Sequence, residues 1–150
     1  MMKISTKGQY GLQALLDLAI YGADDYISLK SIAERQGMSD NYLEQLFASL
    51  KKNGLVESTR GAQGGYRLAK PSKEITVKQV LNALEGPLAL VDCIIEGKES
   101  QCDRFECCVT RVVWQKIMEN LNEVTDAITL ADLVESYKNS KRSAGIEYYI

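Results

Sequence analysis

The feature that most restricts the fold of this chain is a pair of helical segments, each with its own cap, joined by a glycine turn. Ser28 can cap a short helix that ends at Gly37-Met38, and Ser39 can cap a longer helix that ends at Gly54. The longer segment repeats apolar residues at helical spacing and keeps its other face polar; these residues are Leu43, Leu46, Phe47 and Leu50. Two helices in this arrangement predict a helix-turn-helix.

The residues after Gly54 predict a β-hairpin directly behind the helix pair. Residues 55–58 and 66–68 are strand candidates, and residues 60–65 between them include three glycines. A phosphate-binding loop is the alternative interpretation, but such a loop runs into a helix and carries Gly-Lys-Ser or Gly-Lys-Thr, which this stretch lacks. The helix pair and hairpin together predict a winged helix-turn-helix, a mainly α fold with a small β-hairpin wing.

Four further helices complete the prediction. Ser5 or Thr6 can begin a first helix that ends at Gly22, and residues 76–79 form a capping box for a helix that ends at Gly86-Pro87. Thr129 and Asp132 start a short last helix, which we expect to end at Tyr137. Before it, apolar residues recur every three or four positions over about five turns, at Val109, Val113, Ile117, Leu121, Val124 and Ile128. A stripe of this length usually needs a partner.

These segments divide the chain into four regions. We expect a winged helix-turn-helix over residues 1–86 and a cysteine-bearing loop over residues 87–108. A long dimerisation helix and the short last helix occupy residues 109–138. Residues 139–150 form a polar tail that we expect to be disordered.

The distribution of charge and the absence of histidine limit the classes of function. Residues 1–73 contain ten basic and seven acidic residues, net +3, whereas residues 74–150 contain eight and thirteen, net −5. Positive charge thus lies in the half with the helix-turn-helix, as contact with nucleic acid requires. The chain has no histidine, the commonest general base, and no nucleophile–base motif, which argues against an enzyme. It also lacks an apolar run of about 18 residues and a signal peptide, so we expect a cytoplasmic protein without membrane contact.

The polar face of the longer helix has side chains of the kinds that read base edges in the major groove. A recognition helix enters that groove by its N-terminal turns, where Asn and Gln can hydrogen-bond adenine and Glu can accept from the cytosine amino group. The outward residues are Asp40, Asn41, Glu44, Gln45 and Ser49, although a merely solvated face would have the same pattern. Arg60 and Arg67 in the wing suit phosphates or the minor groove, and Ser5, Lys7, Lys51 and Lys52 suit the DNA backbone.

The cysteines are concentrated in one part of the chain. Cys93, Cys102, Cys107 and Cys108 all lie within sixteen positions. In a reducing compartment, such a group more often binds a metal or senses redox state than forms a disulfide framework.

Several stretches, spread over residues 2–137, are similar to those of a known family. They are MKISTKGQY (2–10), IAERQGMS (32–39), YLEQLF (42–47), LKKNGLV (50–56), RGAQGGY (60–66), CVTR (108–111) and ITLADL (128–133). In these stretches the chain closely resembles the IscR-type family of bacterial winged-helix regulators. The resemblance implies a transcription regulator, which we expect to be a repressor, and a homodimer held by the long helix. It also implies contacts with double-stranded DNA by Ser39, Asn41, Tyr42, Glu44, Gln45 and Arg60.

The resemblance further implies a cofactor. In the iron–sulfur branch of this family, three loop cysteines and a variable fourth ligand hold a [2Fe–2S] or [4Fe–4S] cluster, and the matching cysteines are Cys93, Cys102 and Cys108. Where the family often has histidine, this chain has Arg111, which cannot bind iron, so the fourth ligand is Cys107, Glu106, another carboxylate or a residue of the partner chain. Three alternatives stay open: a thiol or disulfide sensor without metal, cysteines that are only structural remnants, and a regulator of sulfur or cysteine metabolism controlled by a protein partner or a metabolite. The branch to which that last alternative belongs generally lacks the loop cysteines.

Overall fold

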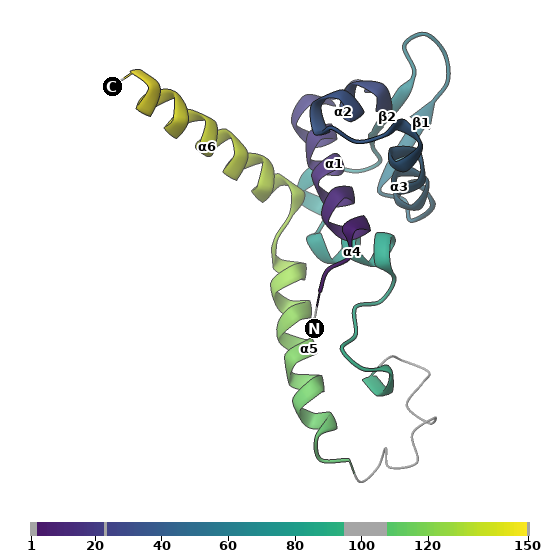
Figure 1. Ribbon diagram of the computed structural model, residues 1–150, viewed down its shortest axis with the longest axis vertical. Coiled ribbons are helices and arrows are strands. Elements are labelled where there is room, and N and C mark those ends of the chain that lie inside the picture. The colour runs from purple at the N-terminus through teal and green to yellow at the C-terminus, as the bar shows by residue number, and fades with distance from the viewer. Residues whose placement is uncertain (1–2, 23, 95–107, 150) are drawn as a thin grey trace.

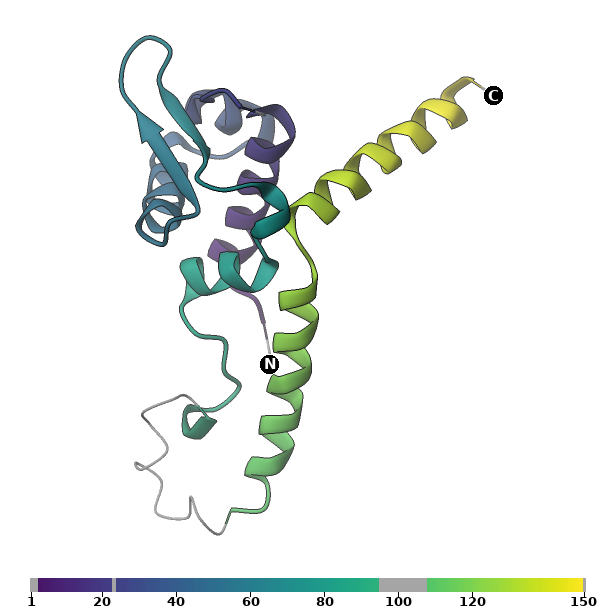
Figure 2. The ribbon, with the colours of Figure 1, turned by 180° about the vertical axis from the view of Figure 1, so that it is seen from behind.

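The computed structural model describes residues 3–22, 24–94 and 108–149 of the chain. The winged-helix body consists of α1 (Thr6–Gly22), α2 (Leu29–Gln36), α3 (Asp40–Lys52), β1 (Val56–Thr59), β2 (Gly65–Leu68) and α4 (Val77–Glu85). The 3-10 helices η1 (Ser72–Glu74) and η2 (Asp92–Ile94) flank α4, and α5 (Arg111–Ala127) and α6 (Leu130–Tyr149) follow. Figure 1 and, from behind, Figure 2 show α5 and α6 extending from this body in different directions. The predicted fold class, mainly α with a two-stranded wing, is confirmed.

The helix pair begins and ends where local chemistry predicts. Ser28 Oγ accepts from the backbone N–H of Ser31 at the start of α2, and Ser39 Oγ accepts from the N–H of Tyr42 at the start of α3, each at 3.2 Å. Gly37 ends α2 in the left-handed region with φ 66°, which a residue with a Cβ adopts only at a cost. These caps fix the turn between the two helices.

The wing is an antiparallel hairpin in which Ser58 is opposite Tyr66 and Thr59 is opposite Gly65. A third backbone segment pairs with its outer edge, because Ile27 and Tyr66 exchange two N–H···O hydrogen bonds of 2.8 Å. Gly65 allows this approach: a Cβ there would lie 2.3 Å from the carbonyl oxygen of Ile27. The wing is thereby attached to the loop between α1 and α2.

One apolar core joins α1, α2, α3 and α4 to the beginning of α6. Its largest fully buried apolar side chains are Leu15, Leu18, Ile32, Leu43, Leu46, Phe47, Leu50, Ile75, Val80 and Leu130. The predicted capping box is present at the start of α4, where Thr76 Oγ1 accepts from the N–H of Gln79 at 3.2 Å and the Gln79 side chain accepts in return from Thr76. A short β-bridge between Thr76 and Thr129 ties this start to the α5–α6 junction.

The last helix is longer than expected. Thr129 and Asp132 cap its start reciprocally, as predicted, with hydrogen bonds of 2.9 and 3.1 Å. Our expectation of an end at Tyr137, followed by a disordered tail, was wrong, because α6 continues to Tyr149. The packing of Leu130 in the core stabilises the first turns of α6. Extending a helix that has already formed is easier than starting one, because each added residue gains a backbone hydrogen bond. No helix in the described part of the chain is long and apolar enough to span a membrane.

Candidate nucleic-acid interface and cysteine segment

The outer face of α3 presents three hydrogen-bonding side chains to solvent. Asn41, Glu44 and Gln45 are all exposed, whereas Leu43 and Leu46 on the same helix are buried in the core. Positions three and four apart share one face of a helix, so these three side chains form a row. The row contains amide donors and acceptors together with one carboxylate, the groups that distinguish base pairs in the major groove.

Ser39 and Tyr42 lie beside this row but have other contacts. Ser39 is exposed and its Oγ caps α3. The Tyr42 ring packs edge-on against Tyr10 with 6.3 Å between ring centroids, and its hydroxyl is buried without a hydrogen-bond partner in the described part of the chain. In this conformation Tyr42 orients α3 against α1, and its hydroxyl is not accessible to a ligand.

The two wing arginines differ in their surroundings. Arg60 is exposed in the loop between β1 and β2. Arg67 is opposite Glu57 in the hairpin, forms an ion pair with it, and lies over the ring of Tyr26 at 4.6 Å. Of the two arginines expected to contact DNA, Arg67 is therefore engaged within the wing, and Arg60 is the one placed to reach outward.

The residues predicted to contact the DNA backbone lie at both ends of the helical body. Lys7 is exposed in the first turn of α1, and Ser5 Oγ accepts from the N–H of Gly8 at 3.3 Å, which caps that helix. Lys51, in the last turn of α3, donates from Nζ to Ser58 Oγ at 2.7 Å. This contact links the end of α3 to the wing, and the remaining ammonium protons of Lys51 can still reach an anion.

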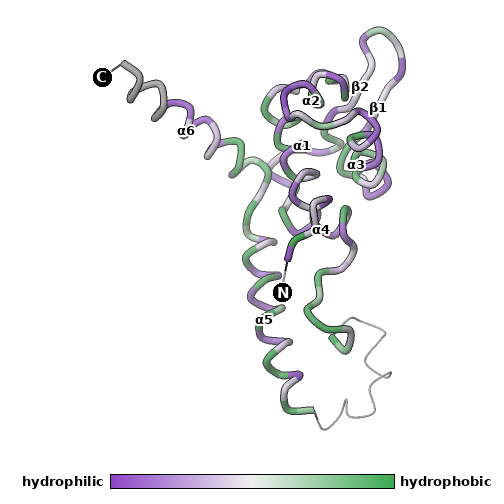
Figure 3. Tube along the Cα trace, in the orientation of Figure 1, coloured by the Kyte–Doolittle hydropathy of each residue, from purple (hydrophilic) through white to green (hydrophobic). Residues whose placement is uncertain are grey.

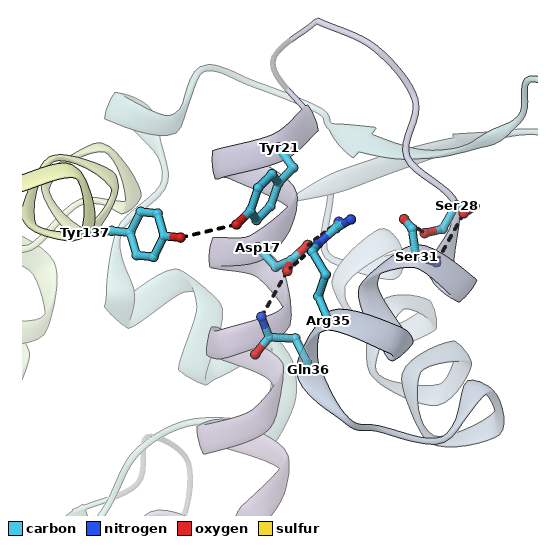
Figure 4. Close-up of polar contacts among 7 residues, drawn as sticks. All are labelled: Asp17, Tyr21, Ser28, Ser31, Arg35, Gln36 and Tyr137. Carbon is cyan, nitrogen blue, oxygen red and sulfur yellow. Dashed lines mark hydrogen bonds and ion pairs between the residues drawn. The ribbon is translucent and has the colours of Figure 1, made fainter. Parts of the chain in front are cut away.

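An ion pair between a buried carboxylate and a partly exposed arginine, which the sequence reasoning missed, holds α2 on α1 (Figure 4). The side chain of Asp17 is fully buried and accepts from Arg35 Nη2 at 2.6 Å, from Arg35 Nε at 3.0 Å and from Gln36 Nε2 at 2.9 Å. The hydrogen bonds with Asp17 raise the pKa of the Arg35 guanidinium, which also lies over the Tyr21 ring at 4.4 Å. The sequence does contain an indication of a buried charge at this position, because Asp17 interrupts an apolar run between Leu16 and Leu18.

The cysteine segment, residues 87–108, is described at its two ends. Cys93 in η2 and Cys108, just before α5, are both half-buried free thiols, and η2 packs against α5. Cys102, Cys107 and Glu106 lie outside the described residues. Cysteine thiolates are the usual ligands of iron–sulfur clusters, so the chemistry of the two described thiols fits such a group. Over residues 3–22, 24–94 and 108–149, no group of three or more Cys, Asp or Glu side chains is placed to hold a metal ion.

The thiol of Cys108 is in a polar setting. Its Sγ lies 3.3 Å from Thr110 Oγ1. Hydrogen bonding from the Thr110 hydroxyl, assisted by the backbone N–H of Arg111, lowers the pKa of Cys108 below its ordinary value. A larger fraction of Cys108 is therefore thiolate at neutral pH, the form that binds metals and reacts with oxidants.

The predicted apolar stripe of α5 is largely uncovered. Figure 3 shows apolar positions repeating along this helix, and the exposed ones near or on it are Val109, Val112, Val113, Leu121 and Val124. Val109 is 81% exposed and Val124 is 57% exposed. Most other large apolar residues of the described chain lie in or beside the core, so α5 is where apolar surface accumulates.

Comparison with known proteins assigns the chain to a family. The model of the Rrf2 family, described as iron-dependent transcriptional regulators, matches residues 4–136. The chain belongs to the Rrf2 family. The IscR transcriptional regulator of Erwinia tasmaniensis is 42% identical over 135 residues, which is 90% of this chain and 80% of the relative.

Solved structures of other Rrf2 regulators have the same fold. IscR of T. potens is 45% identical with a TM-score of 0.74 and is matched over 93% of this chain and 90% of its own. CymR of B. subtilis, named as the global cysteine regulator, is 39% identical with a TM-score of 0.73, over 91% and 98%. This Rrf2 protein is thus a DNA-binding transcriptional regulator and not an enzyme, and the resemblance to IscR-type regulators is confirmed.

Proposed function

We propose that this Rrf2 regulator is a repressor that reads duplex DNA with the exposed face of α3. The observation that carries the proposal is the row of Asn41, Glu44 and Gln45, which lies opposite the buried face of the same helix. Asn41 and Gln45 can bond adenine through two hydrogen bonds each, and Glu44 can accept from cytosine while it repels misplaced phosphates. Ser39 begins the helix at the surface, where its hydroxyl can bond a phosphate.

The remaining contacts would position the protein on the duplex without reading its sequence. Arg60 suits the minor groove or a phosphate beside it, and Ser5, Lys7 and Lys51 suit phosphates flanking the major groove. Tyr42 enters this arrangement as a residue that orients α3, since its hydroxyl is buried. Only a rotation of its ring would turn it into a direct contact.

The regulator acts as a homodimer in this proposal, with the stripe of α5 as the interface. Half-sites one helical turn of DNA apart require two recognition helices in fixed relation. Burial of Val113, Leu121 and Val124 against a second copy removes apolar surface from water at about 25 cal/mol per Å². This gain in free energy would stabilise the dimer, and it would explain why the stripe on α5 is exposed in a single chain.

The signal is received by the cysteine segment. Cys93, Cys102 and Cys108 would hold an iron–sulfur cluster, with Cys107, Glu106, another carboxylate or a residue of the partner chain as the fourth ligand. When bound, such a cluster supplies sensitivity to oxidants, nitric oxide and iron supply. The lowered pKa of Cys108 supports either this role or that of a metal-free thiol sensor.

A second candidate is regulation without a cluster. Likeness to CymR, named as a global cysteine regulator, favours control by a protein partner or a metabolite of sulfur or cysteine metabolism. The four cysteines in residues 93–108 favour the first candidate, because control by a protein partner or a metabolite does not itself require them.

The DNA-reading proposal is tested by selecting duplexes from a random pool with the wild-type protein. Asn41→Ala should lose about 1–3 kcal/mol on the selected duplex and much less on random DNA. Arg60→Ala should weaken binding to both and lower the salt slope by about one. Arg142→Ala on α6, exposed in the same chain, serves as the charge control. Equal loss by Asn41→Ala on both duplexes would contradict base reading by α3.

The cluster proposal is tested by anaerobic reconstitution with iron and sulfide, followed by absorption spectroscopy and iron analysis. We expect a coloured protein and a DNA affinity that changes with cluster loading. A colourless, iron-free protein whose DNA binding is unaffected by Cys108→Ala would exclude the cluster and leave the second candidate.

A further inference from the structure

A carboxylate from α4 lies against the first turn of α1. Glu85, the last residue of α4, accepts a hydrogen bond of 2.6 Å from the backbone N–H of Ser5, 80 residues away in sequence. The Ser5 hydroxyl is engaged on the same turn, where it caps α1 through Gly8. Ser5 and Lys7 therefore share the start of α1 with an acidic group, although α1 itself has no acidic residue in its first turn.

Two glycines of α1 bring α4 this close. A Cβ at Gly8 would lie 2.8 Å from Glu85 Oε1, and a Cβ at Gly11 would lie 2.3 Å from Leu84 Cδ1. A side chain at either position would displace the Glu85 or Leu84 side chain from its present place against α1. The other end of α4 is held as well, because the N–H of Val77 donates to the carbonyl of Ile128 at 2.9 Å. Glu85 is therefore half-buried and placed by the packing of its helix, unlike a free surface carboxylate.

The charge of Glu85 lies where an anion is attracted. The first N–H groups of a helix have no partner within the helix, and the helix dipole is positive at this end. Lys7 adds an exposed positive charge in the same turn. A DNA phosphate that approaches Ser5 and Lys7 would meet the negative charge of Glu85 within the first turn.

We propose that Glu85 sets the DNA affinity of this regulator by holding a competing negative charge at the start of α1. The inference rests on the proposed function in one respect, namely that Ser5 and Lys7 face the DNA backbone. If Glu85 has a purely structural role and only fixes α4 to α1, the expected effect of its removal on DNA affinity is different. Loss of the charge tightens DNA binding in the first case and leaves it unchanged or weaker in the second.

Glu85→Gln separates the charge from the hydrogen bond, because the amide oxygen can still accept from the N–H of Ser5. Binding of the whole chain to a random-sequence duplex long enough for two half-sites is measured by fluorescence anisotropy over a series of salt concentrations. Glu85→Gln should bind about twofold to fivefold more tightly for each protomer. Its salt slope should steepen by up to about 0.9.

Glu74→Gln is the matched control, since it removes the same charge from an exposed position in η1. It should change neither the affinity nor the slope. Glu85→Ala, which also removes the hydrogen bond, should melt at a lower temperature than Glu85→Gln and still bind more tightly than the wild type.

Lys7→Ala distinguishes the two ways in which this inference can fail. If Lys7→Ala leaves affinity and salt slope unchanged, α1 does not face DNA, and both that part of the proposed interface and the inference are wrong. If Lys7→Ala weakens binding, but neither Glu85 variant binds more tightly than Glu74→Gln, the inference about Glu85 is overturned and the proposed interface stands.

Discussion

Arg35 of α2 forms a two-pronged ion pair with the buried carboxylate of Asp17 in α1, through Nη2 at 2.6 Å and Nε at 3.0 Å. Among the described residues, Asp17 is the one charged residue that is buried. The pair fixes α2, and with it the turn that leads to α3, on α1, the helix that Ser5 caps and that carries Lys7. The orientation of the proposed recognition helix therefore depends on a contact between α1 and α2, outside the exposed face of α3.

Asp17→Asn should destabilise the fold. The amide cannot accept both Arg35 bonds together with the Gln36 bond, so buried polar groups lose partners at a cost of about 2 kcal/mol. Urea unfolding followed by circular dichroism measures the loss, with the exposed Asp25→Asn as the control. A midpoint equal to that of the control would mean that the pair contributes nothing net, as happens for some ion pairs.

Gly65→Ala should damage the wing more than Gly54→Ala does. Both glycines have positive φ, 147° and 76°, so both substitutions strain the backbone, by about 1 kcal/mol at Gly54, where the space around the Cβ is open. At Gly65 the new Cβ would also meet the carbonyl oxygen of Ile27 at 2.3 Å and break the pairing with the loop before α2. Thermal unfolding of the two variants measures the difference, and equal losses would argue against the close approach.

Val113→Glu should convert the regulator to a monomer. Val113 is 49% exposed on the apolar stripe of α5, and a carboxylate buried in an interface without a partner costs several kcal/mol. Gln115→Glu adds the same charge at an exposed polar position of the same helix and should leave the oligomer intact. Sedimentation equilibrium gives the mass of each. A dimer for Val113→Glu at wild-type affinity would place the interface elsewhere.

Thr110→Val should raise the pKa of Cys108 toward its ordinary value, because the hydroxyl next to Sγ is lost. The thiolate fraction at neutral pH falls as a consequence, and alkylation of reduced, metal-free protein by iodoacetamide slows at a given pH below that pKa. Peptide-resolved mass spectrometry follows Cys108 apart from the other cysteines. Thr125→Val, whose hydroxyl bonds the carbonyl of Leu121 on the same helix, is the control. Identical pH–rate curves for Cys108 in both variants would remove Thr110 as the cause.

Much of the winged helix could be predicted because its signals act within one turn of the chain. Ser28, Ser39 and Thr76 each cap a helix by bonding a backbone N–H three residues ahead, and Gly37 supplies the left-handed end of α2. The apolar spacing of α3 and α5 is equally local, so it identified which face of α3 is buried and which stripe of α5 is exposed. Of the five residues expected to face outward, Asp40, Asn41, Glu44 and Gln45 are exposed, and Ser49 is half-buried.

The tertiary structure decided what each polar side chain is free to do. Arg67 and Tyr42 are residue types that commonly contact DNA. In the folded chain, however, Arg67 forms an ion pair with Glu57 on the opposite strand. Tyr42 packs against Tyr10, and its hydroxyl is buried. Glu85 meets Ser5 across 80 residues, and Leu130 docks the start of α6 in a core built by distant segments. By itself the sequence determined the caps, turns and amphipathic faces, because these depend on neighbours within about four positions. Exposure, side-chain pairing and the docking of helices depended on residues that only the folded chain brings together.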